Sequence, residues 1–151
     1  ATIRRQRQMC IRDSFSTKDR QNFIDKTIQD ELYAYVGGIC KEMECYPYAI
    51  GGVENHIHIL CLLSKKVALV DFLKTLKAQS SRWIKTKGKK YQKFYWQKGY
   101  GAFSINPSEI SFVKDYIYRQ EEHHRKKTFK QELLYFLNKY DVPYNEKYMW
   151  D

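Results

Sequence analysis

The sequence predicts an α+β domain in which helices pack on one antiparallel sheet. The chain has 151 residues, the length of a single domain, and 43% of them are hydrophobic, which is enough for a core. Stretches with strand-like and with helical hydrophobic spacing follow each other in the order β-α-β-β-α-β-α-α. This order, without internal repeats, predicts one antiparallel sheet covered by helices.

The first half of the chain is predicted to hold a helix and a β-hairpin after a weakly marked first strand. Apolar residues recur at helical spacing over residues 21–43. Two short apolar stretches, 46–52 and 55–63, meet at a tight junction that contains glycine. This arrangement favours two strands paired as a hairpin.

The second half supplies three helices and one strand. Residues 64–87 carry apolar side chains along one helical side, and residues 99–105 alternate small and aromatic residues as a strand can. The run Asn-Pro-Ser-Glu at 106–109 has an N-cap, a first-turn proline and a glutamate three residues after the cap, so a helix should extend to about residue 124. A second capping box begins a final helix over residues 128–140.

The N-terminal residues fit this domain poorly. The apolar Ile11 is followed by Arg-Asp-Ser at 12–14, which is poor strand sequence. Residues 9–14 also resemble the translated end of a sequencing-library adapter. This leads to the hypothesis that residues 1–14 are foreign and that residues 15–151 form the single native domain.

The composition excludes a disordered chain and a membrane-spanning protein. The longest strongly apolar run covers only residues 59–63, far less than a bilayer requires. The N-terminus lacks the apolar stretch of a secretory signal, and the four cysteines show no CxxC spacing. We therefore expect a cytoplasmic protein with reduced cysteines.

The charge of the chain indicates a polyanionic partner. Lysine and arginine outnumber the acids by 27 to 17, which gives a net charge of +10. Residues 72–108, the basic segment, contain no acid and interleave cations with aromatic rings. Cations neutralise phosphates and rings stack on unpaired bases, so the segment predicts binding of single-stranded nucleic acid; the alternative is a solvated basic face with core aromatics. Its cations are Lys74, Lys77, Arg82, Lys85, Lys87, Lys89, Lys90, Lys93 and Lys98.

Two histidines and a helical stripe form the candidate catalytic constellation. His56 and His58 lie two apart on a predicted strand, so both project from the same face and can bind one metal ion. Tyr116 and Gln120 lie one turn apart on the helix predicted to begin after residue 106, at the edge of its buried face. Tyr118 points outward from the same helix. The alternatives are two polar-face histidines without a special role and an amphipathic helix with a border tyrosine.

Together these residues resemble the HUH superfamily, specifically the small single-tyrosine transposases of bacterial insertion sequences. The resemblance extends over nearly the whole chain from Phe15 onwards and also implies an apolar strand just before Phe15, where this chain has CIRDS. It is carried by the blocks FSTK (15–18), GVENHIHIL (52–60), SSRWI (80–84), WQKGYGAFS (96–104) and YIYRQEEHH (116–124).

The resemblance implies a ferredoxin-like sheet with the catalytic tyrosine on a C-terminal helix. His56, His58 and Gln120 would hold Mg²⁺ or Mn²⁺, and Tyr116 would be the nucleophile. Similar enzymes excise and insert single-stranded DNA at hairpins near the ends of their element, through a 5′-phosphotyrosine, and act as homodimers.

Three functions follow as hypotheses. The first is a DNA transposase acting through Tyr116: attack by a tyrosine divides strand breakage and joining into two reversible transesterifications, and a divalent ion stabilises charge on the phosphate. The second is a domesticated HUH nicking enzyme that acts on repeated hairpins. The third is a non-catalytic module of ferredoxin-like fold that binds single-stranded nucleic acid.

Overall fold

The computed structural model describes residues 9–120 and 129–139. Four strands form one antiparallel sheet in the order β2-β3-β1-β4: β1 (Met9–Ser16), β2 (Tyr46–Val53), β3 (His56–Leu63) and β4 (Gly101–Ser104). This α+β architecture with a ferredoxin-like strand order confirms the predicted fold class. No helix of the described ranges combines the length and apolar character needed to cross a membrane.

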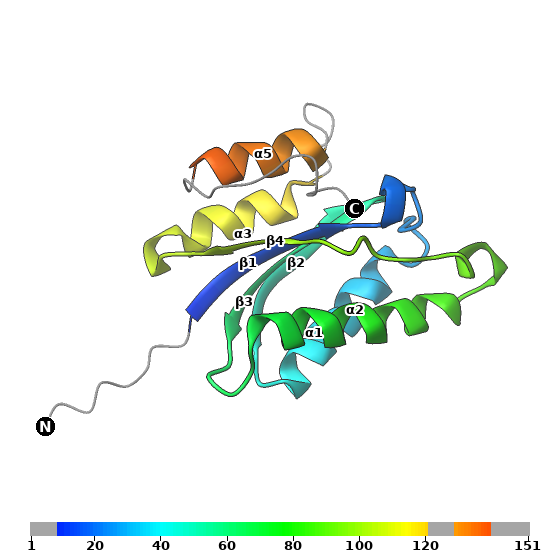
Figure 1. Ribbon diagram of the computed structural model, residues 1–151, viewed down its shortest axis with the longest axis horizontal. Coiled ribbons are helices and arrows are strands. Elements are labelled where there is room, and N and C mark those ends of the chain that lie inside the picture. Colours follow the sequence, from blue (N-terminus) through cyan, green and yellow to red (C-terminus); the bar gives the residue numbers. More distant parts are fainter. Residues whose placement is uncertain (1–8, 121–128, 140–151) are drawn as a thin grey trace, which may run out of the picture.

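Two pairs of helices cover the two faces of the sheet (Figure 1). One face carries α1 (Gln29–Glu42) and α2 (Leu69–Lys85), and the other carries α3 (Ile110–Tyr118) and α5 (Phe129–Lys139). Three short 3₁₀ helices precede α1, follow α2 and precede α3: Lys18–Arg20, Lys89–Tyr91 and Pro107–Glu109.

The alternation of side chains along β3 assigns each residue to one of two cores. Ile57, Ile59 and Cys61 are buried against α1 and α2, whereas Leu60 is buried on the opposite face with residues of α3 and α5. A strand turns successive side chains to opposite faces. His56 and the other even-numbered residues of β3 therefore point toward α3 and α5.

Several predicted helix boundaries are wrong. α1 begins at Gln29 rather than at residue 21, because the preceding backbone finds other partners: the Ile24 amide donates to the Glu54 carbonyl, and the Asp25 carboxylate accepts from the Ile28 amide. α2 also begins later than residue 64. α3 ends at Tyr118, and the predicted continuation over residues 121–124 lies outside the described residues.

The weakly predicted first strand is an inner strand of the sheet. β1 pairs with β3 on one side and β4 on the other, although Arg12 and Asp13 are 1% and 0% exposed. Among the described residues, neither carboxyl oxygen of Asp13 has a hydrogen-bond partner, and burial raises its pKa to about 8. A buried polar group without a partner is destabilising. The hypothesis that residues 1–14 are foreign stays a prediction: Asp13 fits its place poorly, whereas Ile11 of the same strand is buried in the core.

Candidate metal and tyrosine site

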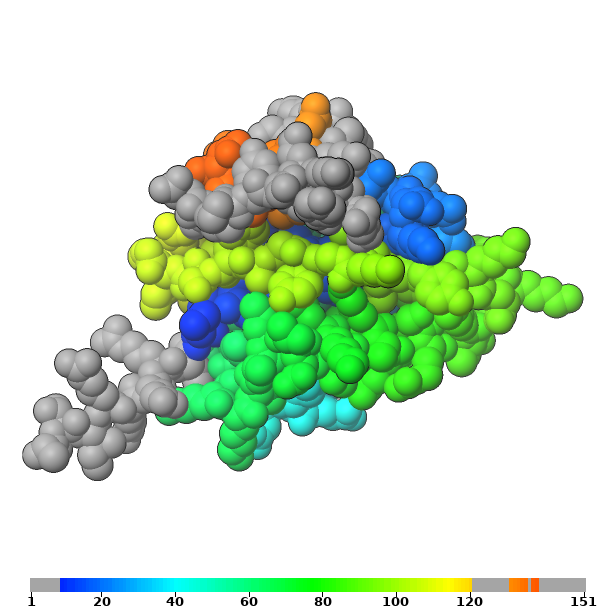
Figure 2. All heavy atoms as spheres, viewed as in Figure 1, coloured from blue at the N-terminus to red at the C-terminus, as the bar shows by residue number. Residues whose placement is uncertain are grey.

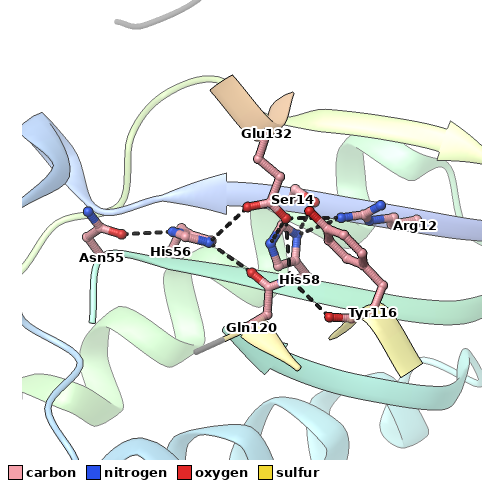
Figure 3. Close-up of polar contacts among 8 residues, drawn as sticks. All are labelled: Arg12, Ser14, Asn55, His56, His58, Tyr116, Gln120 and Glu132. Carbon is pink, nitrogen blue, oxygen red and sulfur yellow. Dashed lines mark hydrogen bonds and ion pairs between the residues drawn. The ribbon is translucent and has the colours of Figure 1, made fainter. Parts of the chain in front are cut away.

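The structure places His56 and His58 side by side on the α3 face of β3 (Figure 3). Both are buried, and their ring centroids lie 5.0 Å apart. Nδ1 of His56 lies 2.8 Å from the Asn55 side-chain oxygen, and Nδ1 of His58 lies 2.5 Å from the Ser14 hydroxyl. A partner on Nδ1 fixes each ring and leaves Nε2 to face the site. Nη2 of Arg12 also lies 3.4 Å from Nδ1 of His58, and a guanidinium can only donate, so in that contact Nδ1 accepts.

Gln120 reaches the same site from just beyond α3. Its Oε1 lies 3.1 Å from Nε2 of His56, while its Nε2 donates to the Tyr116 carbonyl at 3.2 Å. Gly51 of β2 makes this approach possible, because a Cβ there would lie 2.7 Å from the Ile117 carbonyl oxygen. The structure thus brings the three predicted ligands together.

Glu132 of α5 is a fourth group in the site, and the sequence analysis missed it. Its Oε1 lies 3.0 Å from Nε2 of His58, and its Oε2 lies 3.5 Å from Nε2 of His56. It also accepts from Nε2 of Gln120 at 3.3 Å. Glu132 is the only acid in α5 and precedes the buried Leu133, so an acid at the edge of an apolar helix stripe was the available signal.

The donor set fits a divalent cation. The ligand atoms of His56, His58 and Glu132 lie within 4.8 Å of one another, and all three residues are buried. Nε2 of His58 faces the Glu132 carboxylate, whose Oε1 lies 3.0 Å away. If His56 donates from Nδ1 to Asn55, its Nε2 faces oxygen atoms of Gln120 and Glu132. Lone pairs that converge in this way are stabilised by a cation or proton between them.

The protonation states also suit metal binding. Burial lowers the pKa of His58 to about 4, so its imidazole is neutral at pH 7. Burial acts to raise the pKa of Glu132, but the adjacent imidazoles of His58 and His56 outweigh it and bring this pKa well below the ordinary value. Neutral imidazole and ionised carboxylate are the forms that bind a metal ion.

Tyr116 lies at the mouth of this cluster, whereas Tyr118 does not. Tyr116 is half-buried beside the guanidinium of Arg12, whose Cζ lies 4.9 Å from the ring centroid. Burial, followed by the charge of Glu132 and a hydrogen bond to its carboxylate, raises the pKa of the Tyr116 phenol. Tyr118 is 61% exposed, as its place on the helix predicts, and lines an open cleft together with Gln120.

Lys77 of the basic segment is a structural residue rather than a free surface cation. Its ammonium donates to the carbonyls of Gln97 and Gly99 at 3.0 and 2.9 Å and lies over the rings of Phe15 and Tyr100. Burial lowers its pKa to about 8. Lys77 therefore ties α2 to the loop before β4.

The other predicted cations divide into ion-paired and exposed residues. Lys87 pairs with Glu31 at 3.2 Å, and Lys90 pairs with Asp25 at 2.8 Å. Figure 2 shows α2 and the residues after it (green) spread over one side of the molecule, across the sheet from α5 (orange). Lys85 lies 4.1 Å from the Tyr95 ring centroid. The remaining five cations are exposed. Lys74 and Lys98 line a cleft of about 280 Å³ beside α2, whereas Arg82, Lys89 and Lys93 lie outside it.

Comparisons with known proteins identify the fold and the family of this chain. One solved structure, from Deinococcus radiodurans R1 and described as a transposase, is 19% identical with a TM-score of 0.59, over 74% of this chain and 90% of that one. Another, a REP-associated tyrosine transposase bound to a REP hairpin, is 16% identical with a TM-score of 0.61, over 82% and 74%. No curated protein sequence matches significantly. The family model "Transposase IS200 like" matches residues 7–120, and the chain therefore belongs to the IS200-like transposase family.

Proposed function

We propose that this protein cuts and rejoins single-stranded DNA through a phosphotyrosine at Tyr116. One observation carries the proposal: strand β3 and the segment at the end of α3, far apart in sequence, bring His56, His58 and Gln120 together beside Tyr116. Two imidazoles and an amide with a tyrosine nearby suit metal-assisted transesterification.

In the proposed reaction the Tyr116 oxygen attacks the scissile phosphorus. The new O–P bond links the tyrosine to the 5′ end, the bond to the 3′ oxygen breaks, and that oxygen gains a proton to become a free 3′-OH. His56, His58 and Gln120 would hold Mg²⁺ or Mn²⁺, which when bound stabilises the negative charge that develops on the phosphate. A 3′-OH attacking the phosphotyrosine reverses the chemistry and rejoins a strand.

The proposed substrate is single-stranded DNA with hairpins at the ends of a mobile element. A similar structure contains a hairpin, and the basic segment supplies exposed cations and aromatic rings. We also propose a homodimer in the cytoplasm. The REP-associated structure favours a second candidate, a domesticated nicking enzyme that acts on repeated hairpins.

The function is tested by incubation with hairpin-bearing single-stranded DNA and Mg²⁺, followed by a search for a covalent protein–DNA complex. A covalent complex separates both enzymatic candidates from the non-catalytic binding module. Flanking hairpins in the surrounding genome would then separate the transposase from the nicking enzyme.

Neutralising the half-buried Lys85 and the exposed Lys89 and Lys93 with glutamine should weaken DNA binding and its dependence on salt. For single-stranded DNA, each phosphate contact contributes about 0.7 to the slope of log binding constant against log salt concentration. Loss of three contacts should therefore reduce the size of this slope by about 2. Fluorescence anisotropy over a salt series measures both quantities. The matched control replaces three exposed lysines elsewhere, Lys41, Lys65 and Lys114. Equal losses in both triple variants would show that net charge, and not this surface, binds the DNA.

A further inference from the structure

The metal and tyrosine site is closed in this structure, and α5 closes it. His56, His58, Gln120 and Glu132 are each exposed by 3% or less. Figure 1 shows α5 beside α3 on the same face of the sheet, and Figure 3 shows Glu132 reaching from α5 to the two histidines. A phosphodiester of a DNA strand is much larger than a metal ion. It cannot contact the two histidines while they are buried, although Gln120 also lines a cleft of about 270 Å³ together with Gly51 and Gly52.

Glu132 makes the contacts that a scissile phosphate would need. Its two oxygens face Nε2 of both histidines, and it accepts from the amide of Gln120. Glu132 also lies 3.5 Å from the guanidinium of Arg12, which stands beside the Tyr116 ring. A phosphate in position for attack by Tyr116 is likewise an anion whose oxygens lie near the metal ligands and the phenol. The carboxylate and the phosphate therefore require the same space and the same partners.

Among the described side chains of α5, two apolar ones are buried, and Glu132 pairs with Arg12 at 3.5 Å. Leu133 and Leu137 are buried in the same core as Leu60 and Phe103, and Leu133 packs directly on Gly101, where a Cβ would lie 2.6 Å from its Cδ1. α5 has only 11 residues, and the hydrogen bonds of the sheet join the four strands without it. A helix attached in this way can withdraw without unfolding the sheet.

We propose that Glu132 is an internal competitor of the scissile phosphate, so that α5 must withdraw from the site before a DNA strand binds. This proposal rests on the proposed function and adds how that function is regulated. In the DNA-free protein the carboxylate would be a further ligand to a metal ion held by His56 and His58. When DNA binds, its phosphate replaces the Glu132 carboxylate both at the metal ligands and at Tyr116.

The competition is measured with Mn²⁺ and inorganic phosphate on the whole chain, without any need for cleavage. Mn²⁺ binding is followed by calorimetry, and phosphate coordination by the broadening of its phosphorus NMR signal. Glu132→Gln keeps the size of the side chain but removes its charge. If the closed state holds about 90% of the molecules or more, this variant should bind phosphate roughly tenfold more tightly than the wild type.

A second variant tests the helix separately from the carboxylate. Leu133→Ala weakens the packing of α5 and should also increase phosphate affinity, whereas the exposed Asn138→Ala on the same helix should leave it unchanged. In the wild type, phosphate should increase hydrogen exchange of the α5 amides.

Three results would overturn the proposal: unchanged or weaker phosphate binding by Glu132→Gln, equal effects of Leu133→Ala and Asn138→Ala, or no Mn²⁺ binding by the wild type. If Mn²⁺ and phosphate behave as expected but no DNA becomes attached to the protein, the competition stands and the proposed function alone is wrong.

Discussion

The His58→Ala variant should lose strand cleavage by more than about 100-fold and still bind hairpin DNA. Loss of a residue that only orients a metal ligand costs 10- to 100-fold, and loss of the ligand itself should cost more. His58 lies across the sheet from the exposed cations that follow α2, so DNA binding should persist. Cleavage of end-labelled hairpin DNA in Mg²⁺, with anisotropy for binding, measures both effects.

The same assay with a chelator is the control for this prediction. Wild-type cleavage should stop in the chelator and return with added Mg²⁺ or Mn²⁺. Gln120→Ala should reduce cleavage less than His58→Ala, because water can take the place of an amide ligand. Thermal unfolding curves of each variant serve to check that it remains folded. Cleavage that continues in the chelator would contradict the role of the histidine pair.

The Asp13→Val variant should be more stable than the wild type by about 2–4 kcal/mol in free energy of unfolding. Asp13 is a buried carboxyl without a hydrogen-bond partner among the described residues, in the core between β1 and the helices α1 and α2. A β-branched residue suits an inner strand and this apolar surrounding. Urea unfolding at pH 7 measures the difference. The exposed Asp115→Asn should change it by less than about 0.5 kcal/mol.

The pH dependence of the free energy of unfolding tests the burial of Asp13 independently. The pKa of Asp13 is raised to about 8 in the folded protein from an unfolded value near 3.8, so the folded state binds more protons between these values. Stability due to this group should therefore fall as the pH rises from about 4 to 8. The valine variant should lack that decrease. An equal pH slope in both proteins would mean that Asp13 is not buried as the structure has it.

The order of the elements and the pairing of the histidines follow from local pattern. Period-2 alternation is visible in β3, where Ile57 and Ile59 face one core and the histidines face the other. Four-residue spacing in the same way predicted that Gln120 lies near Tyr116, although α3 itself ends at Tyr118. Such patterns report directly which face of an element is buried.

Other features depend on contacts between distant residues. Glu132 became part of the site only because α5 packs on the sheet beside α3, which no local pattern reveals. The ion pairs of Lys87 and Lys90 with acids of the α1 region likewise depend on tertiary packing and leave fewer cations for DNA than the acid-free segment indicates. The start of α1 was missed because the Ile24 amide bonds to a distant carbonyl, an alternative that hydrophobic spacing cannot detect.

Peptide mapping of the covalent protein–DNA complex tests the central claim most directly. Hairpin-bearing single-stranded DNA is incubated with the protein and Mg²⁺, the complex is digested, and the modified peptide is sequenced by mass spectrometry. We expect the adduct on Tyr116, its loss in Tyr116→Phe with metal and DNA binding retained, and its persistence in the matched control Tyr118→Phe. An adduct on Tyr118 or another tyrosine, or undiminished cleavage by Tyr116→Phe, would contradict the assignment.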